Sequence, residues 1–443
     1  MTRGALIAAL LLSPACGGKL DRDALLDPET CKTCHPRQYR EWSGSMHAYA
    51  AADPVFRAMN ARGQRETQGA LGDFCVKCHA PMAVRDGLTT DGLNLDQLPQ
   101  RYRGVTCFFC HQVAAVDGDH NAPLRLSEDL AMRGSFADAI ESEAHETMYS
   151  PLHDRSQLDS SQLCGSCHDI VTPANVHLER TFAEWRGSLF SRPESRESLS
   201  CAACHLPGQE GAAADVAGVP LRRVKDHMMP GVDVALEPFP ELDAQRAAVQ
   251  RDLDTTLLAQ LCVLPTAAGL DVDVDLESVA TGHHWPTGAA QDRRAWVELI
   301  ATTGGVEVFS SGKVADGGRL TDLQDPNLWR FGDRLFDGAG DEVHMFWEAE
   351  RVESSVLPAA TSRDPTDPAY TPTHVLRRYS IPTRPDEIRL RVRMQPMGLD
   401  VLDDLIASGD LDPAIREVMP TFDLAATVLT WRAADGELCV PRR

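Results

Sequence analysis

Apolar and polar residues alternate in several short segments after residue 262, and this alternation predicts β-strands. In the first of these segments Val272, Val274 and Leu276 are separated by acidic residues. Similar strands are expected at 295–301, 306–309, 343–347, 375–381, 388–394 and 425–431. Short alternating strands bounded by Gly, Pro and Asp predict a β-sandwich over residues 263–443, interrupted by a helix at about 399–418.

A helical spacing of apolar residues runs from about residue 241 to 260, so residues 236–262 are expected to form a helical linker. The preceding part of the chain, residues 17–235, is expected to be mostly helical and rich in loops. The predicted fold class is therefore a multidomain α+β protein in which a helical, loop-rich domain is followed by a β-sandwich domain.

The N-terminus has the pattern of an export signal: Arg3 precedes an apolar run over 5–12, and small residues follow. Because this signal ends at Cys16, residues 1–16 resemble a bacterial lipoprotein signal, and a lipid on Cys16 would anchor the protein to a membrane surface. Ordinary cleavage with a free or lost Cys16 is the alternative, since Ser13 stands where such signals usually have Leu. Either reading predicts an exported protein, in the periplasm or as an outer-membrane or cell-surface lipoprotein.

Composition narrows the classes of function. The 443 residues include 65 acidic and 43 basic side chains, a formal charge of -22, which argues against nucleic acid as a partner. This acidity indicates either solubility alone or attraction to a basic partner. Aromatic residues make up only 6% of the chain, so a large apolar cofactor would help to fill a core.

Ten of the thirteen cysteines fall in five Cys-x-x-Cys-His motifs. The cysteine pairs are Cys31 and Cys34, Cys75 and Cys78, Cys107 and Cys110, Cys164 and Cys167, and Cys201 and Cys204. Two thiols at this spacing can form thioethers with the two vinyl groups of one porphyrin, while the adjacent imidazole binds its iron. The sequence therefore predicts five covalently bound c-type haems.

A single Cys-x-x-Cys pair could also be half of a zinc site or a redox-active dithiol. A zinc site would not explain why a histidine follows every pair directly in an exported chain. The same spacing argues against a disulfide framework, which exported proteins with many cysteines otherwise favour.

The histidines of the motifs are expected to bind iron on the proximal side. They are His35, His79, His111, His168 and His205. Ten further histidines are enough to give every iron a second imidazole, and Met is the rival ligand. The candidates for the distal position are His47, His145, His153, His227 and His283.

An internal repeat bears on the distal ligands. Residues 37–47 align with residues 180–190, with Glu41-Trp42 matching Glu184-Trp185, and each copy follows a haem motif. Duplication of a unit of haem and helix would explain this similarity, although chance similarity is the alternative. Phe190 holds the position of His47, so the haem served by the second copy would need another ligand or remain open.

These motifs, together with Tyr39, Glu41-Trp42, Ser45 and His47-Ala48, resemble the multihaem cytochrome c family. That family includes the tetrahaem electron carriers of ammonia oxidisers and the octahaem hydroxylamine oxidoreductases, and the resemblance extends over residues 31 to about 235. It implies closely stacked haems, mostly with two histidine ligands, that transfer electrons. Family members include both carriers and catalysts, and the Cys-x-x-Cys-Lys motif of related nitrite reductases is absent.

Two features of the C-terminal half remain open at this stage. The segment 282–288, Gly-His-His-Trp-Pro-Thr-Gly, resembles a motif of β-domains attached to multihaem cytochromes, so His283 is either the sixth ligand of a haem or a structural residue in a turn. Cys262 and Cys439 bracket the predicted β-domain and form either a disulfide or two free thiols.

The resulting prediction is an electron carrier that exchanges electrons with redox partner proteins, including a membrane-associated complex as one candidate. A reductase or oxidase of a small nitrogen or sulfur compound at one five-coordinate haem is the alternative. A subunit that docks through its β-domain within a larger electron conduit is a third interpretation.

Overall fold

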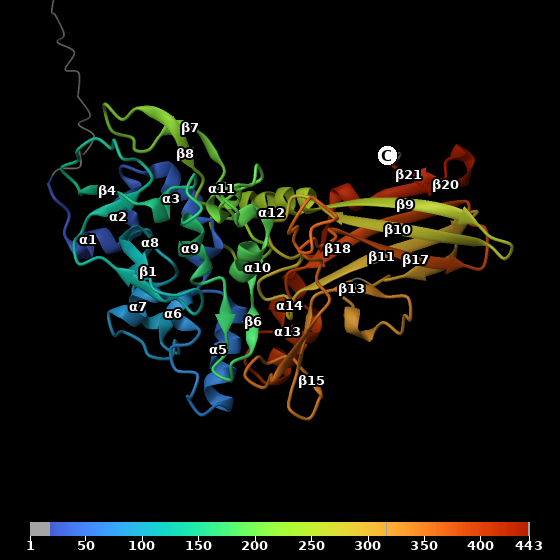
Figure 1. Ribbon diagram of the computed structural model, residues 1–443. Coiled ribbons are helices and arrows are strands. Elements are labelled where there is room, and N and C mark those ends of the chain that lie inside the picture. The colour runs from blue at the N-terminus through green and yellow to red at the C-terminus, as the bar shows by residue number, and fades with distance from the viewer. Residues whose placement is uncertain (1–17, 316, 442–443) are drawn as a thin grey trace, which may run out of the picture.

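The computed structural model describes residues 18–315 and 317–441 (Figure 1). The predicted signal peptide, with Cys16 as its lipid-bearing residue, lies outside the described residues. Short helices make up one side of the molecule, and long strands make up the other (Figure 1). The structure thus confirms a multidomain chain of helices and of strands in several separate sheets.

Most helices before residue 206 are short. The helices of this region are α1 (Arg22–Leu26), α2 (Pro28–Lys32), α3 (Pro36–Ser43), α4 (Met46–Tyr49), α5 (Pro54–Glu66), α6 (Val76–His79), α7 (Pro81–Arg85), α8 (Cys107–Gln112), α9 (Ser160–Gly165), α10 (Thr181–Gly187) and α11 (Cys201–His205). Sequence signals begin several of them: Pro36 opens α3, and the hydroxyl groups of Thr106 and Ser200 cap α8 and α11. Capping helps to fix the orientation of the third and fifth Cys-x-x-Cys-His turns.

Four small two-stranded sheets connect these helices. Their strands are β1 (Val113–Val116) with β2 (Leu124–Leu126), β3 (Met132–Gly134) with β4 (Thr147–Tyr149), β5 (Ile170–Val171) with β6 (His177–Glu179), and β7 (Gly208–Ala212) with β8 (Leu221–Lys225). Only β3 and β4 are parallel. These pairs fix the long loops that carry several of the predicted ligands.

After α12 (Leu242–Thr256) the chain forms two larger sheets. One has the order β17 (His374–Ile381), β10 (Leu270–Ser278), β9 (Leu257–Pro265), β21 (Cys439–Val440). The other has the order β12 (Val306–Ser311), β11 (Arg294–Thr303), β18 (Glu387–Gln395), β19 (Phe422–Asp423), joined by β13 (Trp329–Phe331) and β20 (Leu429–Arg432). A third sheet contains β14 (Asp333–Phe336), β15 (Glu342–Val343) and β16 (Arg351–Ser354).

Four expected elements differ in the structure. The strand expected at 425–431 begins only at Leu429, because Ala425–Thr427 form a turn of 3-10 helix. The helix expected to reach residue 260 ends at Thr256, and β9 follows, because its mostly apolar sequence suits a buried strand as well as a helix. The expected helix at 399–418 divides into α13 (Leu399–Ala407) and α14 (Ala414–Val418), separated by Gly409 in a left-handed conformation and by Pro413. The expected strand at 343–347 is limited to its first residue, since Met345 to Ala349 form a turn.

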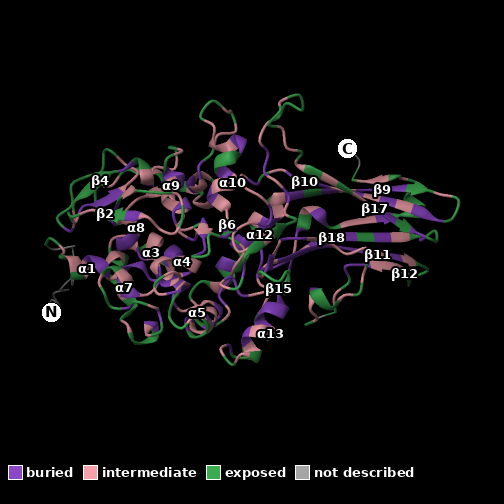
Figure 2. Ribbon diagram, turned by 60° about the horizontal axis from the view of Figure 1, so that its bottom comes forward, coloured by how far each residue is buried: buried purple, intermediate pink, exposed green. Residues whose placement is uncertain are grey.

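The two larger sheets share one apolar core. Alternate residues of β9 and β10, including Leu261 and Val274, pack against Val297 of β11 and Leu390 of β18. Figure 2 shows the buried positions along these strands in purple. A second contact ties the C-terminal half to the helices, because Leu402 and Leu405 of α13 join a buried cluster with Val55 and Ala58 of α5. The helical side is therefore held against the strands by packing as well as by chain connectivity.

A disulfide joins Cys262 on β9 to Cys439 on β21, with the two Cα atoms 4.0 Å apart. It closes a loop of 177 residues around nearly the whole C-terminal half. In the loop-entropy model, a crosslink over such a span stabilises the folded state by on the order of 5 kcal/mol. The alternative of two free thiols is thereby excluded in this structure.

Candidate functional site

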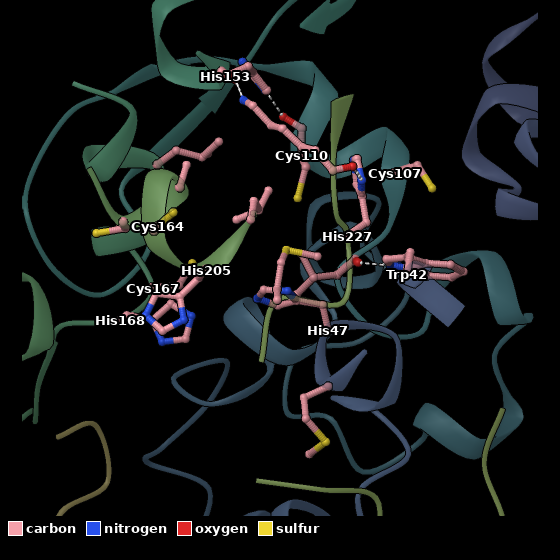
Figure 3. Close-up of a pocket in the computed structure, with 18 of the residues that line it drawn as sticks. Trp42, His47, Cys107, Cys110, His153, Cys164, Cys167, His168, His205 and His227 are labelled. Atoms are coloured by element: carbon pink, nitrogen blue, oxygen red, sulfur yellow. Dashed lines mark hydrogen bonds between the residues drawn. The ribbon is translucent and has the colours of Figure 1, made fainter. Parts of the chain in front are cut away.

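A single large cavity runs through the helical half of the molecule, with a volume of about 1980 Å³. Pockets for one small molecule usually measure about 300–1,000 Å³, so this cavity is too large for one such ligand. All the predicted site residues line it: the ten motif cysteines, the five motif histidines and the five distal candidates. Figure 3 shows part of this lining, including Cys107, His47 and His168. The other histidines, at positions 120, 177, 284, 344 and 374, do not.

The motifs face the cavity because each is wound into one short helical turn. Residues three apart lie on the same side of such a turn, so both thiols of a motif point in one direction. In α8 and α11 the motif itself forms the helix, whereas the first motif joins α2 to α3. Both cysteines of a motif, which are its covalent attachment points, therefore lie on the same wall of the cavity.

Four of the five motif histidines lie opposite a distal candidate across the cavity. The distances between ring centroids are 6.2 Å for His35 and His145, 6.1 Å for His47 and His168, 5.5 Å for His111 and His153, and 6.3 Å for His205 and His283. An imidazole nitrogen binds a transition metal at about 2.0–2.1 Å, so two imidazoles on opposite sides of one ion would have centroids roughly 6 Å apart. The four pairs therefore fit an iron between their rings.

Backbone carbonyls orient most of these rings through Nδ1. His35 Nδ1–H donates to Ala213 O at 2.8 Å, and His205 Nδ1–H donates to Pro230 O at 2.8 Å. His79 bonds to Ala50 O at 3.1 Å in the same way. Each bond leaves Nε2 as the nitrogen that can bind a metal, an arrangement common around metal-binding histidines. His153 differs, because its Nε2 contacts Cys110 O at 2.8 Å and its buried Nδ1 has no hydrogen bond (Figure 3).

Burial keeps these histidines neutral. Desolvation, followed by neighbouring imidazoles, lowers the pKa of His47 and His168 to about 4, and desolvation lowers the pKa of His111 to about 3. Burial likewise lowers the pKa of His153 and His283 to about 4. A neutral imidazole is the form that binds a metal, so the electrostatics of the cavity suit ligation at neutral pH.

The second motif is the exception. The ring of His79 stacks on Phe56 of α5, with centroids 3.9 Å apart and planes 4° apart. Among the described residues, no histidine ring faces His79 across the cavity. The neighbouring Cys75 belongs to an apolar cluster with Leu178 and Phe346, so the space beside this motif is largely apolar.

His227 lines the cavity but faces no motif histidine within the described chain. Glu41 of α3 holds its loop, because a carboxylate oxygen accepts a hydrogen bond from the His227 backbone N–H at 3.0 Å. The same carboxylate lies 3.8 Å from His227 Nδ1 and binds Arg37 at 2.6 Å. His227 lies near His35 and His111, whose pKa values it helps to lower after burial.

Both copies of the internal repeat make equivalent contacts. Trp42 Nε1–H donates to Val105 O at 2.8 Å, and Trp185 Nε1–H donates to Leu199 O at 2.9 Å. In each copy the glutamate before the tryptophan accepts a hydrogen bond from a histidine backbone N–H: Glu41 from His227, and Glu184 from His284. The repeat therefore carries a glutamate that fixes a distant histidine-bearing loop.

Glu184 anchors the segment 282–288, which contains His283. Its Oε2 accepts hydrogen bonds from the Thr287 hydroxyl at 2.5 Å and from the His284 backbone N–H at 3.1 Å. Thr287 also contacts the hydroxyl of Thr181 at 2.9 Å. Sequence reasoning noted the repeated glutamate but did not assign it this role, although its presence in both copies was the available signal.

We expect Glu184→Ala to weaken ligation by His283. The change removes the acceptor of two hydrogen bonds and leaves a partly buried N–H without a partner, at a cost of about 1–3 kcal/mol. The expected result is an increase in high-spin haem of up to one haem per chain, measured by electron paramagnetic resonance of the oxidised protein. Glu41→Ala is the matched control, because it releases His227, which faces no motif histidine. Equal spectra for the two variants would contradict the assignment.

Comparisons with known proteins agree with this site. Residues 30–112 match the family described as cytochrome c554 and c-prime. The chain has the fold of a penta-haem cytochrome c552 from Thermochromatium tepidum, with a TM-score of 0.63 and 21% identity over 92% of this chain and 99% of that one. No curated protein matches the sequence. The motifs, the family match and the shared fold together support a multihaem c-type cytochrome with covalently bound haem.

Proposed function

We propose that this protein relays electrons between redox partners through five covalently bound haems, one at each Cys-x-x-Cys-His motif. When bound, each haem supplies an iron that exchanges one electron. The observation that carries the proposal is that all five motifs open into one cavity, so no motif is isolated by protein from the others. The chain contributes attachment, ligation and spacing.

Contacts between cysteines give the order of the motifs. Direct interaction between Cys31 and Cys107 is the largest cause of their pKa shifts, and the same holds for Cys164 and Cys201. The first motif therefore adjoins the third, and the fourth adjoins the fifth. Burial and then the nearby Cys167 raise the pKa of Cys110 to about 12, which supports a position of the third motif beside the fourth.

The second motif branches from this series. The dominant interaction of Cys78 is with Cys167, so the second motif adjoins the fourth. The resulting order is first, third, fourth and fifth, with the second attached to the fourth. Thiols do not titrate once thioethers form, so these pairs support the proposal through proximity alone.

The two ends of the series reach the surface. At the first motif, Ile140 and Val216 line the cavity and are 42% and 45% exposed, on the loops that hold His145 and that bond His35. At the fifth motif, Cys204 is exposed, and Leu199, also a cavity residue, is 42% exposed. We assign electron entry and exit to these two openings, without a preferred direction.

The four histidine pairs support bis-histidine ligation at the first, third, fourth and fifth motifs. Low reduction potentials are expected there, because the potential-raising Met ligand is not used. A closer relationship to the carriers of ammonia oxidisers or to the hydroxylamine oxidoreductases, expected from the sequence, stays a prediction. Four further expectations also stay predictions: export, a lipid on Cys16, a membrane-associated redox partner and the lack of a nucleic-acid partner.

Within the described residues, no helix has the length and apolarity needed to cross a membrane.

A second candidate function is reduction or oxidation of a small nitrogen or sulfur compound at the second motif. The observation that favours it is the lack, among the described residues, of a histidine opposite His79, which would leave one iron position for a ligand. The compound would enter an apolar space lined by Phe56, Met59 and Phe346.

His47→Ala tests the relay, because His47 faces His168 at the motif where the series branches. The variant is expected to lose one low-spin haem and to slow the transfer of electrons between the two ends. Stopped-flow mixing of the reduced protein with an oxidised soluble cytochrome would measure this transfer as a slower or incomplete reoxidation. His120→Ala, outside the cavity, is the control. Unchanged spectra and rates in His47→Ala would contradict the proposed order.

Titration of the oxidised protein with hydroxylamine or nitrite tests the second candidate. We expect spectral changes that correspond to one binding site per chain, because only the second motif lacks an opposing histidine in the described chain. Absorbance at the haem Soret band measures the stoichiometry. No spectral change at saturating ligand would exclude the second candidate and leave the relay in place.

A further inference from the structure

Glu179 occupies an unusual position beside the second motif. It ends strand β6, where it pairs with Ile170 of β5, and its side chain lines the cavity. The preceding Leu178 packs in the apolar cluster that contains Cys75, and Glu179 itself raises the pKa of Cys78, after Cys167 and burial. Strand β6 lies between the helical half and the two larger sheets (Figure 1). A carboxyl group therefore faces the space next to the second motif.

This carboxyl group has no hydrogen bond or ion pair within the part of the chain that the structure describes. Other enclosed carboxyl groups of the region have structural partners: Asp53 Oδ1 accepts a hydrogen bond from Val55 N, and Glu184 binds Thr287. Asp292 accepts a bond from Gln291. Glu179 is half-buried and lines the cavity. A proton is the simplest partner that this carboxylate can gain there.

The charges around Glu179 come from three segments. Arg293 and Asp292, directly before β11, influence its pKa, as do Asp233 and Asp169. Burial is the largest influence and the three aspartates add to it, whereas Arg293 opposes them; the net effect raises the pKa of Glu179 to about 7. Arg293 is itself held by Asp233 through two hydrogen bonds at 3.0 and 3.1 Å, so much of its charge is already compensated.

We propose that Glu179 takes up one proton when an electron arrives at the second motif, so that reduction and protonation are coupled there. One electron, supplied by a redox partner protein or a chemical reductant, would reduce ferric iron to ferrous iron, and one proton from solvent would form an O–H bond on the Glu179 carboxylate. The net charge of the pocket then stays constant. The physical cause is electrostatic: an electron added to the nearby iron makes the negative charge of the Glu179 carboxylate less favourable in an enclosed space, and protonation removes that charge. The inference rests on the proposed haem at the second motif but not on the relay.

The test measures proton uptake during chemical reduction of the full holoprotein in weakly buffered solution. Near pH 7 the wild type is expected to take up as much as one proton per chain more than Glu179→Gln. In the same range the potential of the second haem should fall by up to about 59 mV per pH unit in the wild type, the value for a tenfold change at one electron. Glu179→Gln should lose this dependence, and Glu179→Asp should restore it.

Glu141→Gln is the matched control, because Glu141 also lines the cavity but is exposed at its mouth. Equal proton uptake by Glu179→Gln and the wild type, with equal haem content, would overturn the proposal. If Glu179→Gln does not fold, the wild type alone decides: its reduced-minus-oxidised infrared spectrum should show a new protonated carboxyl band, and the lack of one would overturn the proposal. A chemical reductant supplies the electrons directly, so failure of the relay would leave this test valid.

Discussion

The separation between paired imidazoles is the constraint on which the rest of this structure depends. The helical half surrounds a large cavity, and its short helices hold two walls of that cavity at the distance that a metal bound on both sides requires. Protein interiors are normally close-packed, so a cavity of this size would not stay open without something that fills the space between its walls. The covalently bound haem supported by the motifs and the family match would replace the missing core. This reading also explains a chain with only 6% aromatic residues.

Two glutamates set the position of the loops that complete the cavity. Glu41 and Glu184 occupy equivalent positions in the repeat, and each binds the backbone of a loop that carries a histidine. Only the second of these loops, which contains His283, brings its histidine opposite a motif. The strand-rich half thereby takes part in the site. Packing of α13 on α5 and the hydrogen bonds of Glu184 act together to keep that loop in place.

The sequence was most informative where the chemistry is local. The Cys-x-x-Cys-His spacing led to ten cysteines and five histidines that all line one cavity, and alternation of apolar residues found β10, β11 and β18. Pairing of the histidines could not be predicted, since it depends on tertiary contacts between segments as distant as His47 and His168. His227 shows this limit: it lies in the cavity, but its loop does not bring it opposite a motif histidine. The strand β9 was missed because a continuous run of apolar residues does not show whether the segment is a helix or a strand. Glu179 was missed because a single acidic residue forms no motif that could be recognised in the sequence.

Electron paramagnetic resonance of the fully oxidised protein, with the signals quantified per chain, tests the central claim most directly. The account predicts low-spin signals from four haems, one for each pair of facing histidines, and a high-spin signal from one haem at the second motif. Five low-spin haems, or more than one high-spin haem, would contradict the claim that these histidine pairs determine the coordination of each iron.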